Sequence, residues 1–379
     1  MTLALPPQRD LFDIPDDIAY LNCSYMAPQL RSVTEAGLAA VRAKAQPWSI
    51  AAVDFFTQVE QLRAEFAALI GADTDGIALV PSVSYGIATA AANLPIPEGS
   101  TIVTMAEEFP SNVYAWRQAA AASGAEVLTA SPEPHGDWTP TVLANITERT
   151  AIVAVPHCHW TDGSMVDLVA VGAAARAVGA ALVVDASQSL GAAPLDLAAV
   201  RPDFLVAVGY KWLLGPYSLG YLYVDQARRG GTPLEHNWIA RLGSEDFTRL
   251  VDYVDEFQPG ARRFDVGERS NFVLVPMALA AIRQIASWTV PAIAATISDL
   301  TERIARDARQ CGYFAPARRH PMKSPHMLGL RAESGVPPGL AARLAAERVH
   351  VSVRGDSIRV SPHVYNTDDD VDRLIAALR

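Results

Sequence analysis

A lysine and an aspartate each follow a strand-like apolar run of the sequence, and together they could do chemistry. Asp185 ends the run "ALVVD", and Lys211 follows "DFLVAVGY" further along the chain. Burial disfavours the charged form of a lysine, so a lysine at such a position has a lowered pKa and becomes nucleophilic. Lysines of this kind form Schiff bases with carbonyl compounds.

Pyridoxal phosphate is the commonest carbonyl cofactor that a lysine holds in this way, and the nearby residues suit it. Asp185 could keep the pyridine nitrogen protonated, as the cofactor needs when it acts as an electron sink. Gln188 could donate to the ring hydroxyl. The phosphate needs backbone N–H groups and hydroxyls near the start of a helix. The stretch "PSVSYGIATA" supplies Ser82, Ser84 and Gly86 at such a place.

Each of these residues also has a purely structural interpretation. An aspartate after a strand often caps a helix, and a lysine there is often solvated. The combination of both with a hydroxyl-rich loop favours the cofactor site. His157, Cys158, His159 and Asp162 could be imagined as metal ligands, but adjacent residues of a strand point to opposite faces. We therefore expect no metal site.

The elements that must position these residues alternate along the first two thirds of the chain. Strands are expected at 76–82, 101–106, 151–157, 181–187, 203–209 and 220–225, and helices at 60–71, 85–94, 111–124 and 168–179. Short apolar strands between helices are typical of an α/β fold with a mostly parallel sheet flanked by helices. Ligands of such sheets bind beyond the carboxyl ends of the strands. The candidate residues fall at these ends.

The pattern changes after residue 226. Residues 226–270 are irregular and charged, and long helices are expected within 272–310. A hairpin at 348–365 and an acidic-capped helix at 368–378 complete a smaller α+β domain. We predict a large cofactor domain at 26–259, a small domain at 260–379, and an N-terminal segment at 1–25 that packs on the small domain.

Composition narrows the class of protein. The net charge of −10 and the lack of a basic block argue against nucleic acid or an anionic membrane as partner. Three cysteines, far apart, suggest neither a disulfide framework nor a metal clip. No signal peptide pattern and no apolar run of about 18 residues is present. We expect a cytoplasmic protein.

The motif "DASQSLGAAPLD" followed by "GYKWLLGP" resembles the class V aminotransferase group of fold-type I pyridoxal phosphate enzymes. This group includes cysteine desulfurases, kynureninases and isopenicillin N epimerase-like proteins. The resemblance runs from "YLNCSYMAP" to "IRVSPHVYNTDDDVDRL", nearly the whole chain. It implies a pyridoxal phosphate cofactor, an amino-acid substrate, and a homodimer with active sites at the subunit interface.

The resemblance assigns roles to the motif residues. Lys211 matches the Schiff-base lysine, Asp185 the partner of the pyridinium nitrogen, and Gln188 the contact to the ring hydroxyl. Val83 and Ser84 lie at the turn that binds the phosphate in this family.

Further positions follow from the same resemblance. Tyr210 matches a kynureninase tyrosine that reaches the phosphate. Phe109 should stack on the pyridine ring, although a place in the apolar core is the alternative. Trp160 should shape the pocket. Arg359 matches the arginine that grips the substrate carboxylate with its bidentate fork, with a surface ion pair as the alternative. Asn22 is a second candidate for substrate binding.

The resemblance also predicts a contribution from the partner subunit and shows one departure. The loop "FDVGERSN" should cross to the partner's phosphate site, with Ser270 and Asn271 as candidates. Desulfurases need a cysteine ahead of the carboxylate-binding arginine, but here the stretch is "HVSVRGDSI". This argues against a persulfide relay of that kind. Cys158 is the only cysteine near a strand end, and it could face away from the pocket. Cys23 lies in the turn "NCSY", which approaches the substrate in this family, so the resemblance implies that it is the one residue that could support desulfuration.

Three reactions therefore compete: transamination, cleavage of the side chain, and epimerisation. The sequence does not decide between them, and the resemblance favours an aminotransferase. A catalytically silent binding protein is the alternative of another class, against which the intact set of motif residues argues. A nicotinamide-dependent reductase is disfavoured because no Gly-x-Gly-x-x-Gly follows the first strand.

Overall fold

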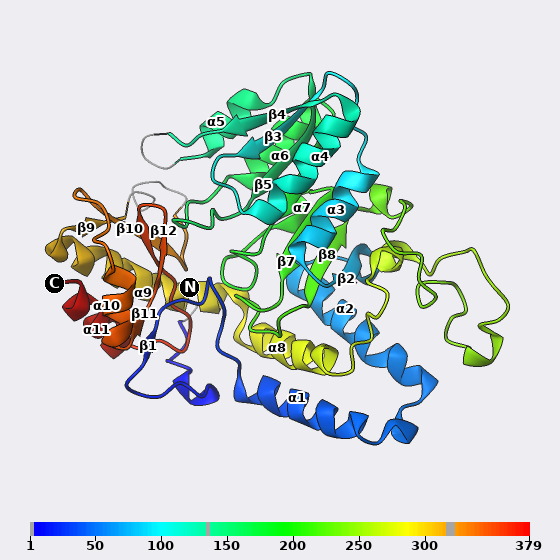
Figure 1. Ribbon diagram of the computed structural model, residues 1–379, viewed down its shortest axis with the longest axis horizontal. Helices are drawn as coiled ribbons and strands as arrows, with labels where there is room; N and C mark the ends of the chain where they lie inside the picture. Colours follow the sequence, from blue (N-terminus) through cyan, green and yellow to red (C-terminus); the bar gives the residue numbers. More distant parts are fainter. Residues whose placement is uncertain (1–3, 134–136, 316–322) are drawn as a thin grey trace.

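The computed structural model describes residues 4–133, 137–315 and 323–379 (Figure 1). A seven-stranded sheet forms the centre of the larger part. Its strands, in spatial order, are β2 (Ile77–Val80), β8 (Gly220–Val224), β7 (Phe204–Val208), β6 (Ala181–Asp185), β5 (Thr150–Pro156), β3 (Thr101–Met105) and β4 (Glu126–Ala130). Only β8 runs antiparallel to its neighbours. The mostly parallel sheet predicted from the sequence is therefore confirmed.

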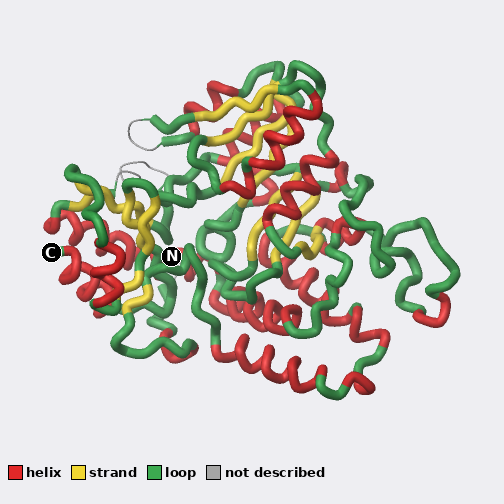
Figure 2. Tube along the Cα trace, in the orientation of Figure 1, coloured by secondary structure: helices red, strands yellow, loops and turns green. Residues whose placement is uncertain are grey.

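Helices cover both faces of this sheet, which explains why its central strands are apolar throughout. On one face, α2 (Thr57–Ile70), α5 (Thr139–Asn145) and α6 (Leu168–Ala177) share a core with the strands. On the other, α3 (Val83–Asn93) and α4 (Tyr114–Ser123) do so. Figure 2 shows this layered arrangement of helices around the sheet. The short α7 (Leu197–Val200) precedes β7.

Two of these helices end at glycines, as their sequence predicts. Gly71 follows α2 with φ 70°, and Gly124 follows α4 with φ 72°. Both angles lie in the left-handed region, which glycine adopts without a steric penalty. Each glycine thus ends its helix and lets the chain turn toward the next strand, β2 or β4.

A smaller antiparallel sheet lies at the other end of the molecule. It contains β12 (Ser352–Arg354), β13 (Ser357–Val360), β10 (Leu328–Ala332) and β9 (Tyr313–Phe314), in that order. Helices α9 (Val290–Ala308), α10 (Leu340–Ala346) and α11 (Asp368–Leu378) pack on it around a separate apolar core. The predicted hairpin is β12–β13. The predicted smaller α+β unit is thus present (Figure 1).

The N-terminal segment runs beside this smaller sheet. Strand β1 (Ala19–Tyr20) pairs in parallel with β11 (Val349–His350), and Asn22 bridges to Ser361. The chain then enters α1 (Arg31–Lys44), which packs on α8 (Leu274–Trp288). Helix α8 also packs on α2, so it connects α1 and the N-terminal segment to the helices that cover the central sheet.

Within the described residues, no single helix has the length and apolar composition to cross a membrane. Helices α8 and α9 meet these criteria only together, and the chain bends by 76° between them. Many of their apolar side chains are buried in the protein core.

Candidate active site

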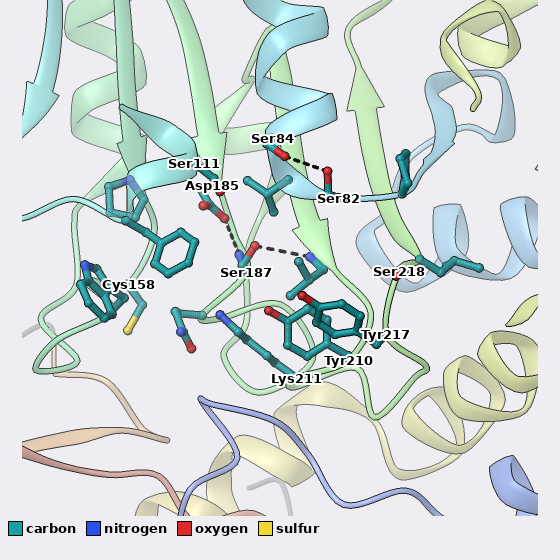
Figure 3. Close-up of a pocket in the computed structure, with 18 of the residues that line it drawn as sticks. Ser82, Ser84, Ser111, Cys158, Asp185, Ser187, Tyr210, Lys211, Tyr217 and Ser218 are labelled. Carbon is teal, nitrogen blue, oxygen red and sulfur yellow. Dashed lines mark hydrogen bonds between the residues drawn. The ribbon is translucent and has the colours of Figure 1, made fainter. Parts of the chain in front are cut away.

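The carboxyl ends of the central strands border a cavity of about 310 Å³ (Figure 3). Asp185 is the last residue of β6, and Lys211 follows β7 after a short turn. Helix α3 begins on the opposite side of the cavity from Lys211, and Asp185 lies between them. The cavity is lined by Pro81, Ser82, Val83, Ser84, Glu108, Phe109, Ser111, Pro156, Cys158, Trp160, Asp185, Ser187, Gln188, Val208, Tyr210, Lys211, Tyr217, Ser218 and Leu219.

The N-terminus of α3 forms one end of this cavity. Ser82 caps the helix, because its Oγ accepts a hydrogen bond from Tyr85 N at 3.2 Å. The hydroxyls of Ser82 and Ser84 are 2.8 Å apart. A Cβ at Gly86 would lie 2.7 Å from the Val206 side chain, so glycine allows α3 to pack closely on β7. Free N–H groups, hydroxyls and the helix dipole make this end suitable for a phosphate.

Asp185 and Lys211 are both buried, and burial changes both pKa values. Asp185 accepts a hydrogen bond from Ser187 N at 2.9 Å. Burial raises the pKa of Asp185 above its usual range, against the effect of the bonds from Ser187. Burial lowers the pKa of Lys211 to about 8, although the Asp185 carboxylate opposes this shift. The amine is therefore partly unprotonated, and hence nucleophilic, near neutral pH.

Aromatic side chains surround the lysine. The Nζ atom of Lys211 is 5.5 Å from the ring centre of Phe109 and 5.7 Å from that of Tyr210. Phe109 packs edge-to-face on Trp160 at 5.5 Å, and Trp160 Nε1 donates to Glu107 O at 2.6 Å. Phe109 is 37% exposed and lines the cavity, so it does not take the core position that was its alternative.

The side-chain amide of Gln188 is fixed by two hydrogen bonds. Its Oε1 accepts from Trp212 Nε1 at 3.0 Å, and its Nε2 donates to Ser24 O at 3.1 Å. The indole can only donate, so it determines which way the amide points. The amide group therefore presents an oriented N–H group at the cavity wall.

A second cavity, of about 300 Å³, adjoins the first toward the smaller sheet. Arg359, on β13, lines it and is 2% exposed. Its Nη1 donates to Trp160 O at 2.8 Å, while its buried Nε has no hydrogen-bond partner among the described residues. Burial, with a contribution from Arg354, lowers the pKa of Arg359 to about 9. No ion pair joins Arg359 to another described residue, so its surface alternative does not hold.

Some candidate residues lie outside both cavities in the single chain. Ser270 Oγ donates to Phe55 O at 2.6 Å, and Asn271 Oδ1 accepts from backbone N–H groups at the start of α8. Asn22 Oδ1 accepts from Ser352 Oγ at 2.8 Å. Their roles at the cofactor and substrate stay predictions.

The two cysteines near the site differ from expectation. Cys158 lines the first cavity and therefore does not face away from the pocket. Cys23 is fully buried beneath Lys211, with its Sγ 4.0 Å from the lysine carbonyl oxygen, and lines neither cavity. Burial raises the pKa of both thiols, which disfavours their reactive thiolate form.

Glu108 is a cavity residue that the sequence analysis missed. Its carboxylate accepts from Phe109 N at 2.6 Å and from Asn112 Nδ2 at 3.3 Å. Burial, and then the nearby Asp185, raises the pKa of Glu108 to about 8. Its position shortly after β3 is the signal that could have identified it, because Asp185 and Lys211 were found by the same criterion.

The four residues considered as metal ligands have other partners. His157 Nδ1 bonds to Ser189 Oγ at 2.9 Å, and the ring of His159 stacks on Trp138 at 4.6 Å. Within residues 4–133, 137–315 and 323–379, no group of three or more His, Cys, Asp or Glu side chains could hold a metal ion.

Fold and site together define a lysine-containing cavity at the carboxyl edge of a mostly parallel sheet. Comparison with known proteins assigns the family. The family model described as "Aminotransferase class-V" matches residues 41–374, so the chain belongs to this family of enzymes. The family, fold class and pyridoxal phosphate cofactor predicted from the sequence are thereby confirmed.

Individual relatives extend over most of the chain. The uncharacterized aminotransferase YcbU of Bacillus subtilis is 27% identical over 376 residues, 92% of this chain and 94% of that protein. Isopenicillin N epimerase of Streptomyces clavuligerus is 25% identical, with 84% of this chain and 83% of that protein covered. A solved structure of a C-DES variant, with glycine covalently linked to its PLP cofactor, superposes with a TM-score of 0.86. It is 19% identical and covers 98% of this chain and 99% of its own, which shows the same fold.

Proposed function

We propose that this chain catalyses a pyridoxal phosphate-dependent transamination of an amino acid, with Lys211 as the residue that holds the cofactor. The observation that carries the proposal is a buried, nucleophilic amine that shares one cavity with Asp185 and with the N-terminus of α3 on the opposite side. Bound there, the cofactor supplies an electron sink for a carbanion at the substrate Cα.

The cavity residues fit this cofactor from end to end. Ser82, Ser84 and the N-terminus of α3 bind the phosphate, and Asp185 holds a proton on the pyridine nitrogen. Gln188 donates to the ring hydroxyl, and Phe109 covers one face of the ring. The high pKa of an uncompensated buried Asp185 supports this pairing, because a positively charged N–H would stabilise its carboxylate.

The remaining groups act on the amino acid. Arg359 binds the α-carboxylate, for which its unpaired, buried Nε is suited. The amine of Lys211 would move the proton of the substrate Cα. The aromatic side chains of Phe109, Tyr210 and Trp160 exclude water from the reacting atoms.

We favour transamination over the two other candidate reactions, epimerisation and cleavage of the side chain. Epimerisation is supported by the similarity to isopenicillin N epimerase, and side-chain cleavage by the resemblance to kynureninases and desulfurases. A persulfide relay is disfavoured, because the β12–β13 hairpin carries no cysteine and the Cys23 thiol lies outside both cavities. YcbU, which matches over nearly its whole length, is described as an aminotransferase.

We also propose a homodimer in the cytoplasm, with Ser270 and Asn271 near the partner's phosphate site. Large apolar side chains are exposed on α1, on the segment after it, and on the projecting segment 232–258 (Figure 1). They include Val41, Trp48, Val53, Trp238, Leu242, Val251 and Tyr253. Exposed large apolar side chains gathered in neighbouring parts of the sequence are a feature of protein interfaces. The three cysteines are free, as in a reducing compartment.

The lysine assignment can be tested sharply because the chain has only three lysines, Lys44, Lys211 and Lys323. The protein loaded with pyridoxal phosphate is reduced with borohydride, digested, and mapped by mass spectrometry. We expect the pyridoxyl group on Lys211 alone, and loss of the bound-cofactor absorbance in Lys211→Ala. Label at Lys44 or Lys323 with none at Lys211 would refute the assignment.

The reaction type needs a separate experiment. Under transamination, a single amino acid should bleach the cofactor absorbance stoichiometrically and release a 2-oxo acid, and a second 2-oxo acid should restore the band. Turnover without an acceptor, giving alanine or pyruvate with ammonia, would instead establish side-chain cleavage. Racemisation of the recovered amino acid would establish epimerisation.

A further inference from the structure

Two arginines lie on the same face of the β12–β13 hairpin. Arg354 pairs across the strands with Ser357, and Arg359 pairs with Ser352. Alternate residues of a strand share a face, so Arg354 and Arg359 are diagonal neighbours across the hairpin. Such neighbours lie roughly 7–8 Å apart. Both side chains line the second cavity described above, next to Lys211, which we call the outer cavity.

Neither arginine has an acidic partner among the described residues. Arg354 is half-buried, donates from Nη1 to its neighbour Val353 O at 2.8 Å, and lies over the ring of Trp160 at 5.9 Å. Asp356, only two residues away, pairs instead with Arg331 at 3.3 Å. The Arg354 guanidinium is thus held in place at the cavity wall without a counter-ion.

The outer cavity as a whole is cationic, although the protein carries a net charge of −10. The described residues that line it include no aspartate or glutamate; they are Ser24, Tyr25, Met26, Phe109, Trp160, Gln188, Tyr210, Lys211, Tyr217, Arg354 and Arg359. The two arginines repel each other enough that Arg354 contributes to lowering the pKa of Arg359. A ligand with one carboxylate would neutralise only one of them.

We propose that the amino-acid substrate carries a second anionic group at the end of its side chain, and that Arg354 binds this group while Arg359 binds the α-carboxylate. The inference rests on the proposed function, because it places the substrate Cα beside Lys211. The shared chemistry is a negatively charged, hydrogen-bond-accepting terminus, either carboxylate or sulfonate. The aromatic side chains that line the same cavity suit an apolar spacer.

The test uses the cofactor-loaded protein and pairs of amino acids that differ in one charge. The pairs are aspartate with asparagine, glutamate with glutamine, and the sulfonate cysteate with serine. The observable is kcat/KM for the bleaching of the cofactor band. We expect the anionic member to be preferred by tenfold or more in at least one pair. Loss of one charge-assisted hydrogen bond in Arg354→Gln should reduce that preference by about 10- to 100-fold.

The variants separate charge from structure. Arg354→Lys should keep part of the preference, and Arg354→Glu should reverse it in favour of the amide. Arg343→Gln removes an exposed arginine of α10 that pairs with Glu347, and should leave the preference unchanged. The carboxylate and sulfonate pairs distinguish the two kinds of terminus.

Two results would overturn the inference. One is a wild-type protein that turns over the neutral members as well as the anionic ones. The other is an Arg354→Gln variant with an unchanged preference. Borohydride labelling of Lys211 in the same preparations confirms that each variant is folded and loaded. A wild-type protein that binds no cofactor would overturn the proposed function, and this inference with it.

Discussion

Two clusters of buried charge lie beside the central sheet, and they differ in whether their charged groups form ion pairs with one another. One contains Arg63, Asp265 and Arg269 and joins α2 to β2 and to the loop before α8. The other contains Asp185, Lys211 and Arg359 and borders the two cavities. Both are almost fully buried, so burial alone does not distinguish them.

The charges of the first cluster are paired with one another within the chain. Asp265 accepts from Arg63 Nη2 and Arg269 Nη1, both at 2.7 Å, and from Leu79 N at 2.7 Å. Arg63 Nε and Nη1 have further partners in Glu60 and Ile77. Buried charges that are paired and hydrogen-bonded in this way maintain the fold.

The charged groups of the second cluster are not paired with one another. None of Asp185, Lys211 and Arg359 forms an ion pair with another described residue. Their pKa values are shifted mainly by burial, toward the neutral form in each case. Buried charges without partners are costly unless a ligand compensates them. The difference indicates that the first cluster stabilises the fold and that the second cluster binds a ligand.

The largest expected effect is on the ion-paired cluster. Asp265→Asn removes the carboxylate that two buried guanidiniums share and leaves Arg269 without an acidic partner among the described residues, so it should lower the free energy of unfolding by about 3–5 kcal/mol. Denaturant unfolding of the cofactor-free protein measures this. The matched control is Asp73→Asn, which removes the exposed partner of Arg229 and should cost less than about 1 kcal/mol. Equal effects of the two substitutions would contradict the comparison.

A smaller effect, on activity instead of stability, is expected at the cavity. Asp185→Asn preserves the shape of the side chain but cannot supply the charge that holds the pyridine proton. We expect turnover to fall by about 10²–10³-fold, with modestly weaker cofactor binding. Unfolding of the cofactor-free variant should change little, because Asp185 has no ion pair to lose. Near wild-type turnover in this variant would rule out the role.

The two clusters also show what the sequence could predict. Asp185 and Lys211 were found because each follows an apolar run, and a parallel sheet gathers the ends of such runs at one edge. The roles of Arg63 and Asp265 could not be foreseen, because Asp265 lies in a charged, irregular loop and Arg63 in an ordinary amphipathic helix. Their partnership depends on a contact between residues 202 positions apart.

The roles of two adjacent residues, Glu107 and Glu108, could not be distinguished from the sequence either. In "EEFPSN" the first glutamate, Glu107, is exposed and the second, Glu108, lines the cavity. No local propensity separates the two, since the distinction arises from how the loop after β3 turns. Likewise, nothing in the sequence assigned Arg354 to the site. Its position beside Arg359 follows from the register of the β12–β13 hairpin.

The smallest effect concerns the pH at which Lys211 reacts. Burial lowers its pKa to about 8, against about 10.4 for lysine in a model peptide. Between these values Lys211 is unprotonated while an ordinary lysine is not. Reductive labelling of the cofactor-free protein with a small uncharged aldehyde should therefore reach half its maximal rate at Lys211 near pH 8. A lysine-containing peptide treated in parallel provides the reference.

The neighbours of Lys211 determine the sign of further shifts. The Asp185 carboxylate raises the pKa of Lys211, so Asp185→Asn should move the midpoint of labelling to lower pH. Arg359 lowers that pKa, so Arg359→Gln should move the midpoint to higher pH. Opposite shifts would show that both charges act on the amine through the cavity although neither forms an ion pair with it. A midpoint that stays at the peptide value in all three proteins would mean that Lys211 is not held in the buried environment described.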